Sequence, residues 1–175
     1  MSEHTGTEIK SSLHSDGATG LIRMNASYES STVAVWSAIT DPQELALWYG
    51  KVEGDLREGG DFSAFIFGSE WDGRGHINTC VPLHELSIIE SEEGGPEVTV
   101  SVRLTPEDGT TTLDVEVGGL PPEFLWAFGA GWHTQLERLG EYLEGRGPKD
   151  LSTSWLERCD ALAPSYREKP VVPID

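Results

Sequence analysis

The sequence predicts an α+β protein in which a curved antiparallel sheet packs around one long C-terminal helix. The segments before residue 120 alternate apolar and polar residues over short lengths, and turn residues separate them closely, as in antiparallel sheets. Apolar residues in segment 124–145 recur at steps of three and four and line one helical face: Leu125, Phe128, Trp132, Leu136, Leu139 and Leu143. An apolar helical face must pack against another apolar surface, and the predicted sheet provides one.

The predicted long helix has clear limits. Pro121 and Pro122 precede it, Glu123 suits the positive end of the helix dipole, and Gly145 ends it. The side away from the apolar stripe carries charged residues, which we expect to face solvent: Glu137, Arg138, Glu141 and Glu144.

Residues 1–19 are rich in Ser, Thr and Gly without a period, which predicts a disordered N-terminal arm. Residues 21–28 alternate as a strand. Ser30 or Ser31 can cap a short helix that runs to Thr40, and Asp41-Pro42 starts a second one.

Further strands are expected in six segments, so that the sheet has about six to seven strands in all: 52–57, 62–67, 71–81, 86–90, 98–104 and 113–117. The last two form a hairpin. Gly73 and Gly75 permit a bulge in segment 71–81, and such a bulge would exchange the faces beyond it. We therefore expect one domain over residues 20–147, followed by an extension over 148–175.

The charge of the chain excludes some partners. Twelve basic against 30 acidic residues give a net charge of −18, which repels nucleic acid and anionic lipid surfaces. No run of about 18 apolar residues or signal peptide is present, so a cytoplasmic protein is expected. The histidines and the two cysteines, Cys80 and Cys159, are scattered, so no metal site or cofactor is expected.

The order and spacing of several groups of residues resemble a known family. The opening is Val35-Trp36-Ser37-Ala38-Ile39-Thr40-Asp41-Pro42 with Leu45 and Trp48-Tyr49-Gly50. Residues 52–60 with Phe62 follow, and then Gly75, Ile77, Pro82 and Leu86. The long helix contributes Gly131-Trp132-His133, Leu136, Leu139 and Tyr142-Leu143. Residues 20–145 thus resemble the chaperone-ATPase-activator homologues within the superfamily of START-related, birch-pollen-allergen-like and polyketide cyclase proteins.

This resemblance implies the helix-grip fold. It also implies an internal cavity between the sheet and the long helix, which in relatives accepts apolar or amphipathic small molecules. It does not imply a reaction.

Eight residues are candidates for binding such a ligand: Trp132, His133, Trp48, Tyr49, Phe62, Trp71, Ile77 and Phe128. Aromatic side chains suit a mostly apolar pocket, although tryptophans also fill ordinary cores. His133 lies at the border of the helical stripe, where it reaches either the cavity mouth or solvent. His76 belongs to the polar face of its strand, which we expect to face solvent.

Three functions remain open from the sequence. The favoured one is a non-enzymatic binding or carrier domain for an apolar or amphipathic ligand. The alternative is a cyclase-like or hydratase-like enzyme in which His133 and His76 transfer protons. A third is a regulator or co-chaperone-like interaction protein that uses its acidic surface. No residue is assigned as catalytic.

The C-terminal extension predicts one more helix. Leu151, Trp155, Cys159 and Leu162 recur at steps of four, four and three, so residues 152–163 should form a short amphipathic helix that ends at Pro164. A helix of this length is only marginally stable in isolation, so we expect its apolar face to pack on another part of the protein. We expect Trp155 to pack on the outer face of strand 62–67, where Phe65 and Phe67 point outward, or across a homodimer interface, aided by the basic residues of the tail.

Overall fold

The computed structural model describes residues 7–145 and 151–174 of the chain. Its elements follow in the order β1 (Ile9–Ser15), β2 (Gly20–Tyr28), α1 (Thr32–Thr40), α2 (Pro42–Trp48), β3 (Gly50–Gly54), β4 (Asp61–Ile66), β5 (Asp72–Val81), β6 (Glu85–Ser91), β7 (Val98–Glu107), β8 (Thr110–Leu120), the 3-10 turn η1 (Pro122–Phe124), α3 (Leu125–Leu143), α4 (Leu151–Glu168) and β9 (Val171–Pro173). The predicted α+β class and the order of the predicted elements are confirmed, but the sheet has nine strands instead of six to seven, because β1 and β9 were not expected.

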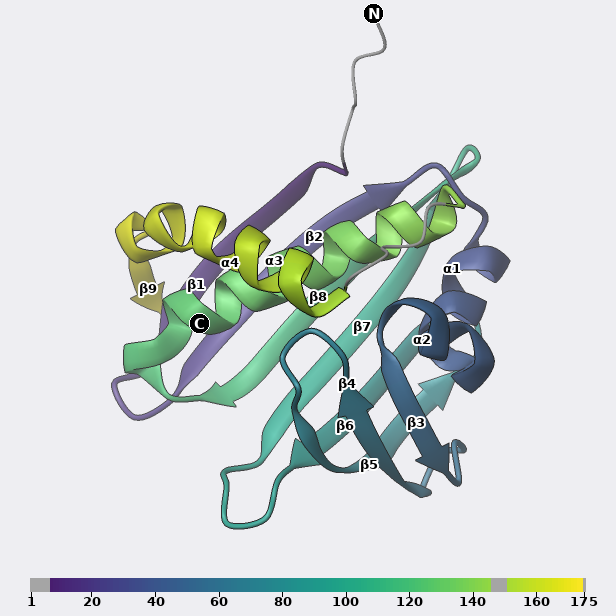
Figure 1. Cartoon of the computed structure of the whole chain (residues 1–175), viewed down its shortest axis with the longest axis horizontal. Helices are drawn as coiled ribbons and strands as arrows, with labels where there is room; N and C mark the ends of the chain where they lie inside the picture. The colour runs from purple at the N-terminus through teal and green to yellow at the C-terminus, as the bar shows by residue number, and fades with distance from the viewer. Residues whose placement is uncertain (1–6, 146–150, 175) are drawn as a thin grey trace, which may run out of the picture.

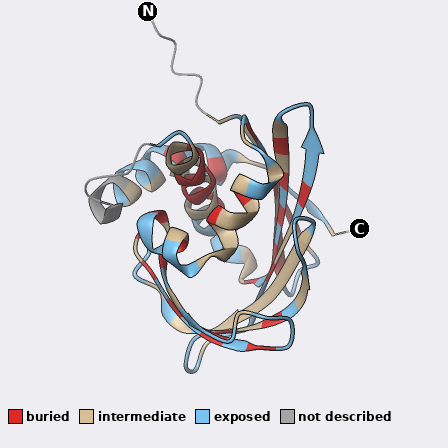
Figure 2. Cartoon of the chain, turned by 90° about the vertical axis from the view of Figure 1, so that its right-hand side faces the viewer, coloured by how far each residue is buried: buried red, intermediate tan, exposed pale blue. Residues whose placement is uncertain are grey.

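The strands form one nine-stranded sheet in the order β3-β4-β5-β6-β7-β8-β2-β1-β9. Neighbouring strands are antiparallel except for β1 and β9, which are parallel. Helix α3 lies across one face of the sheet, and α4 lies against α3 (Figure 1). Viewed from the side, the sheet curves around the buried α3 (Figure 2). The sheet and its long helix thus form the expected grip.

Local chemistry sets the limits of the short helices. The Ser31 side chain accepts a hydrogen bond from the Ala34 N–H and caps α1, and the Asp41 side chain accepts from the Gln43 N–H and caps α2. The β7–β8 turn places Asp108 and Gly109 at positive φ (44° and 84°), as a type I′ hairpin requires.

The core consists of two clusters of buried apolar residues. The larger one joins β2, β7 and β8 to α1, α2 and α3, and Ile22, Val35 and Leu139 are among its least exposed members. The smaller one lies on β4 and β5 around Phe62, Ala64, Ile66 and Ile77. Tyr28 links the sheet to the long helix, because its hydroxyl donates a 2.7 Å hydrogen bond to the Leu136 carbonyl.

The prediction of a disordered N-terminal arm was wrong for residues 9–15, which form β1. Residues 1–6 lie outside the described residues. Strand β1 pairs with β2 through a turn in which Asp16 Oδ1 accepts from the Ala18 and Thr19 N–H groups, each at 2.8 Å. Leu13 is buried in the larger cluster, whereas the neighbouring serines carry little strand signal. One buried leucine among polar residues is too weak a pattern to detect.

The helix in the C-terminal extension exists, but its predicted end at Pro164 was wrong, because α4 continues to Glu168. Proline removes the hydrogen bond to the carbonyl four residues earlier, and here that carbonyl belongs to the exposed Asp160. Buried Leu162 and Tyr166 hold the last turns onto α3. The predicted domain boundary at residues 147 and 148 lies outside the described residues.

The predicted position of Trp155 on the outer face of the sheet was also wrong. Its ring lies between α3 and the β4–β5 turn, where a methyl group added at Gly68 would lie 2.5 Å from it and one at Gly131 3.2 Å. The surface that α4 covers is therefore the back of α3 in the same chain. The alternation of β4 is as expected, with Ile66 buried and Phe65 exposed. Dimerisation stays a prediction.

Within the described ranges, every helix is too short or too polar to cross a membrane.

Candidate functional site

A cavity of about 330 Å³ lies between the concave face of the sheet, α3 and the α1–α2 pair. Residues of both core clusters line it, so the cavity separates the two. Most of its wall is aliphatic or aromatic, and it is lined by Trp36, Ile39, Thr40, Leu45, Trp48, Tyr49, Val52, Leu56, Phe62, Ala64, Ile66, Ile77, Cys80, Leu86, Ile88, Glu90, Val100, Val102, Leu113, Val115, Trp132, Gln135, Leu136 and Leu139. Such a concave, largely apolar space is typical of a small-molecule site.

The helical wall of the cavity carries aromatic side chains in fixed positions. Trp132 comes from α3, and Trp48 and Tyr49 come from the end of α2. The Trp48 indole N–H donates a 3.0 Å hydrogen bond to the Ala38 carbonyl, and its ring stacks on Tyr142 with centroids 6.4 Å apart. The Tyr142 hydroxyl donates to Glu44 Oε1 at 2.8 Å. These contacts hold the aromatic wall in place without filling the space beside it.

The opposite wall comes from the sheet. The Phe62 ring lies over Gly75, where a methyl group would meet it at 2.1 Å, so only glycine fits below this ring. The β5–β6 register shifts between Ile77 and Thr79. As a result Ile77 and Cys80 both line the cavity, which strict alternation would not allow. The expected bulge is present, although it lies beyond the two glycines.

One carboxyl and one amide side chain line this apolar space without a protein partner. Within the described part of the chain, neither Glu90 on β6 nor Gln135 on α3 makes a side-chain hydrogen bond or ion pair, and both line the cavity. Burial raises the pKa of the Glu90 carboxyl to about 7. Burial, and then the nearby Glu90, raise the pKa of the Tyr49 phenol well above its usual value. The cavity therefore offers a ligand one acid that titrates near neutral pH.

Sequence reasoning missed Glu90, although its strand contains the signal. Leu86, Ile88 and Glu90 alternate along β6, and all three line the cavity. The predicted strand 86–90 already included Glu90, but a charged side chain on a strand is usually expected to face solvent. Every second side chain of a strand lies on the same face, so the inward Leu86 and Ile88 would have predicted an inward Glu90.

Five of the eight candidate ligand-binding residues line the cavity: Trp48, Tyr49, Phe62, Ile77 and Trp132. The other three do not. Trp71 precedes β5 and its ring lies against Gly73. Phe128 is on the cavity side of α3 but is 37% exposed, so the cavity ends between Phe128 and Trp132.

His133 was listed as a ligand-binding candidate that reaches either the cavity mouth or solvent, and both positions were wrong, because it faces α4. Its Nδ1 lies 2.8 Å from the Tyr166 hydroxyl, and its Nε2 lies 3.5 Å from Glu137. His76 is on the polar outer side of β5 as expected, with Nδ1 2.7 Å from Asp61. Neither histidine lines the cavity.

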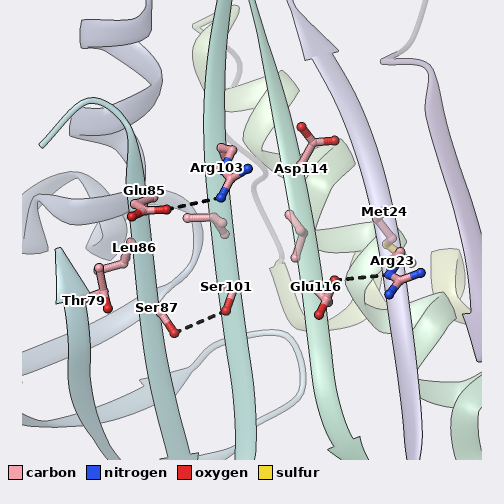
Figure 3. Close-up of a pocket in the computed structure, with 12 residues that line it drawn as sticks. Arg23, Met24, Thr79, Glu85, Leu86, Ser87, Ser101, Arg103, Asp114 and Glu116 are labelled. Carbon is pink, nitrogen blue, oxygen red and sulfur yellow. Dashed lines mark hydrogen bonds and ion pairs between the residues drawn. The ribbon is translucent and has the colours of Figure 1, made fainter. Parts of the chain in front are cut away.

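A second hollow, of about 470 Å³, lies on the outer face of the sheet (Figure 3). Its charged side chains pair across the strands: Arg103 with Glu85 at 3.5 Å and Arg23 with Glu116 at 3.2 Å. Its wall is more polar than that of the first cavity, and its charged side chains already have partners, Asp114 through the Asn25 amide at 2.6 Å, so it has less to offer an apolar ligand.

The fold and the cavity define a protein of the helix-grip class, and comparison with known families agrees. The family described as "Activator of Hsp90 ATPase homolog 1-like protein" matches residues 30–144. The chain belongs to this family. No curated protein sequence matches the chain significantly.

Solved structures give the same result. CalU16 from Micromonospora echinospora is 30% identical with a TM-score of 0.70 in its crystal structure, over 94% of this chain and 100% of CalU16. DynU16, a protein of the dynemicin biosynthetic locus, is 30% identical with a TM-score of 0.66, over 72% of this chain and 48% of DynU16. EF2215 from Enterococcus faecalis, at 14% identity and a TM-score of 0.67 over 92% of both chains, shares the fold.

Proposed function

We propose that this protein binds or carries a small apolar or amphipathic molecule in the cavity between the sheet and α3. The cavity itself supports this proposal most directly, because the sheet and the helices leave about 330 Å³ of largely apolar space between them, where a closely packed core would leave none. An apolar wall with a few unpaired polar groups suits a ligand that is mostly hydrocarbon with one or two polar atoms.

The family supports the same proposal. Members of this superfamily commonly bind small apolar ligands or resemble polyketide cyclases. One relative, DynU16, belongs to a biosynthetic locus. A ligand from the biosynthesis of a natural product would fit both the cavity and this relationship.

A second candidate is a cyclase-like or hydratase-like enzyme that uses the same cavity. The histidines first considered for proton transfer, His133 and His76, lie outside it. Glu90 favours this candidate instead, because a carboxyl whose pKa is about 7 can both donate and accept a proton at neutral pH. In that role Glu90 would be the general acid or base.

Native mass spectrometry of the protein purified from its own host tests the binding proposal. We expect a small molecule to accompany the folded protein and to be released on unfolding. Incubation of that molecule with fresh protein separates the two candidates: a carrier returns it with unchanged mass and chromatographic retention, and an enzyme changes one or both.

Binding of the neutral dye Nile red tests the location of the site. Trp132→Ala should weaken binding by roughly tenfold, since it removes one aromatic wall of the cavity. Trp126→Ala is the matched control, because Trp126 lies on the same helix outside the lining, beneath the Arg167 guanidinium at 3.8 Å. Unchanged dye binding in a folded Trp132→Ala protein would contradict the proposed site.

A further inference from the structure

Among the residues that the structure describes, Glu90 is the one charged side chain that lines the cavity. Strand β6 carries it on the same face as Leu86 and Ile88, opposite Gly75 of β5 and Val98 of β7. Neither of these two neighbours can pair with a carboxyl group. A partly desolvated carboxyl without a partner destabilises the fold, and this one lines the space that a ligand would occupy.

The surroundings of Glu90 contain no counter-charge. All basic side chains among the described residues lie outside the cavity lining. The lining instead supplies neutral donors and acceptors from Gln135 on α3 and Tyr49 after α2. The protein as a whole carries a net charge of −18, so its field attracts cations and repels anions.

We propose that the ligand of this cavity carries a basic amine, and that Glu90 is the specificity-determining residue that pairs with the protonated nitrogen. This inference rests on the proposed binding function and narrows its ligand class. The apolar wall would hold the hydrocarbon part of the ligand, and the ion pair would supply the counter-charge that the protein does not give Glu90. Neutral and acidic analogues of the same shape would leave the carboxyl unpaired or repel it.

Amine binding should depend on pH through Glu90 alone. The other titratable groups of the lining are Tyr49 and Cys80, and burial raises the pKa of both, so they stay neutral between pH 6 and 8. The helices α1, α2 and α3 and the strands β3, β4, β7 and β8 contribute no ionisable side chain to the lining. The Glu90 carboxyl, with a pKa of about 7 before binding, ionises across this range, while an alkylamine stays protonated.

Three probes with one naphthalene body test the proposal: 2-naphthylmethylamine, 2-naphthylmethanol and 2-naphthoate. Their affinities are measured by isothermal titration calorimetry at pH 6 and pH 8 for the wild type and Glu90→Gln. The control is Glu92→Gln, which removes the same charge from an exposed position two residues further on. Glutamine keeps the size of the side chain, so Glu90→Gln should fold, and its melting temperature checks this.

At pH 8 the wild type should bind the amine at least about tenfold more tightly than the alcohol, and naphthoate most weakly. Amine affinity should fall by about tenfold between pH 8 and pH 6, because the carboxyl must then lose a proton before it can pair. Glu90→Gln should abolish both the preference and the pH dependence, so that its amine and alcohol affinities lie within about twofold of each other. Glu92→Gln should behave as the wild type.

Equal affinities for amine and alcohol in the wild type would overturn this proposal, and so would a preference that survives in folded Glu90→Gln. Either result leaves the binding function standing, because the alcohol still binds. If none of the three probes binds, the proposed binding function fails, and the assignment of Glu90 fails with it.

Discussion

The two sides of α3 are packed in opposite ways. Toward α4 the helix presents small residues, and large side chains fill the space: a methyl group at Gly129 would lie 2.6 Å from the Tyr166 ring. Toward the sheet it presents Trp132 and Gln135, and a cavity of about 330 Å³ remains. One helix therefore has a filled interface on one side and an open space on the other.

Two carboxyl groups show the same contrast. Burial raises the pKa of Glu137 on the α4 side, but hydrogen bonds and charges from Arg158 and His133 outweigh burial and lower it to about 2. Arg158 holds Glu137 with two hydrogen bonds of 2.7 and 2.8 Å. Glu90 on the cavity side has no such partner, and its pKa rises to about 7. The α4 side therefore has paired charges and little free space, and the cavity side has an unpaired carboxyl and open space.

The largest expected effect is at Tyr166, the buried centre of the α4 side. Its hydroxyl donates to Ser11 Oγ at 3.0 Å and lies 2.8 Å from His133 Nδ1, and its ring covers Gly129. Tyr166→Ala should lower the free energy of unfolding by about 3–5 kcal/mol, measured by urea denaturation. Tyr166→Phe keeps the ring and should lower it by only about 1 kcal/mol. A loss below about 1 kcal/mol in the alanine variant would show that α4 contributes little.

Two alanines test the difference in packing with the same substitution. Ala130 is buried on the α4 side of α3, and Ala64 lines the cavity from β4. Ala130→Leu should lower the free energy of unfolding by about 1–3 kcal/mol, because no space is available. Ala64→Leu should change it by less than about 1 kcal/mol, because the added atoms enter the cavity. Equal losses in the two variants would mean that both sides are filled.

The two carboxyl groups should respond to pH with opposite signs. Glu137 has a lowered pKa in the folded state, so it stabilises the fold above about pH 4.5, and this stabilisation is lost as the pH falls toward 2. Glu137→Gln should therefore lower the free energy of unfolding at pH 7 by about 1 kcal/mol and have less effect at pH 3.

Glu90 has a raised pKa, so its contribution is most favourable below about pH 4.5 and is lost as the pH rises through 7. Glu90→Gln should raise the free energy of unfolding at pH 8 by about 1–2 kcal/mol and leave it nearly unchanged at pH 4. Urea denaturation of both variants at several pH values checks the signs. A Glu90→Gln protein that is less stable than the wild type at pH 8 would show that the carboxylate has a partner.

The sequence predicted strands β2 to β8, the short helices and the cavity side of α3 because local patterns determine them. Steps of three and four located Leu136, Leu139 and Trp132, and alternation located Phe62 and Ile77. Their contribution to the cavity could be expected once the helix-grip resemblance was noted.

The same patterns failed where a distant segment covers a polar surface. Arg138 was expected in solvent but is 5% exposed, and His133 faces Tyr166, because α4 covers the back of α3. A helical stripe shows one apolar face and gives no sign of a second covered face built from Gly129, Ala130 and Thr134. Glu90 was missed for another reason, since a cavity tolerates a charge at an inward position that a filled core would exclude.

Calorimetric titration of 2-naphthylmethanol into the wild type, Ala64→Leu and Ala130→Leu tests the central claim, that the space beside α3 is a ligand site. We expect the wild type to bind one equivalent and Ala64→Leu to bind at least about tenfold more weakly, because leucine occupies the space. Folded Ala130→Leu should bind as the wild type does. Wild-type affinity in Ala64→Leu would contradict the account, because the ligand would then bind elsewhere.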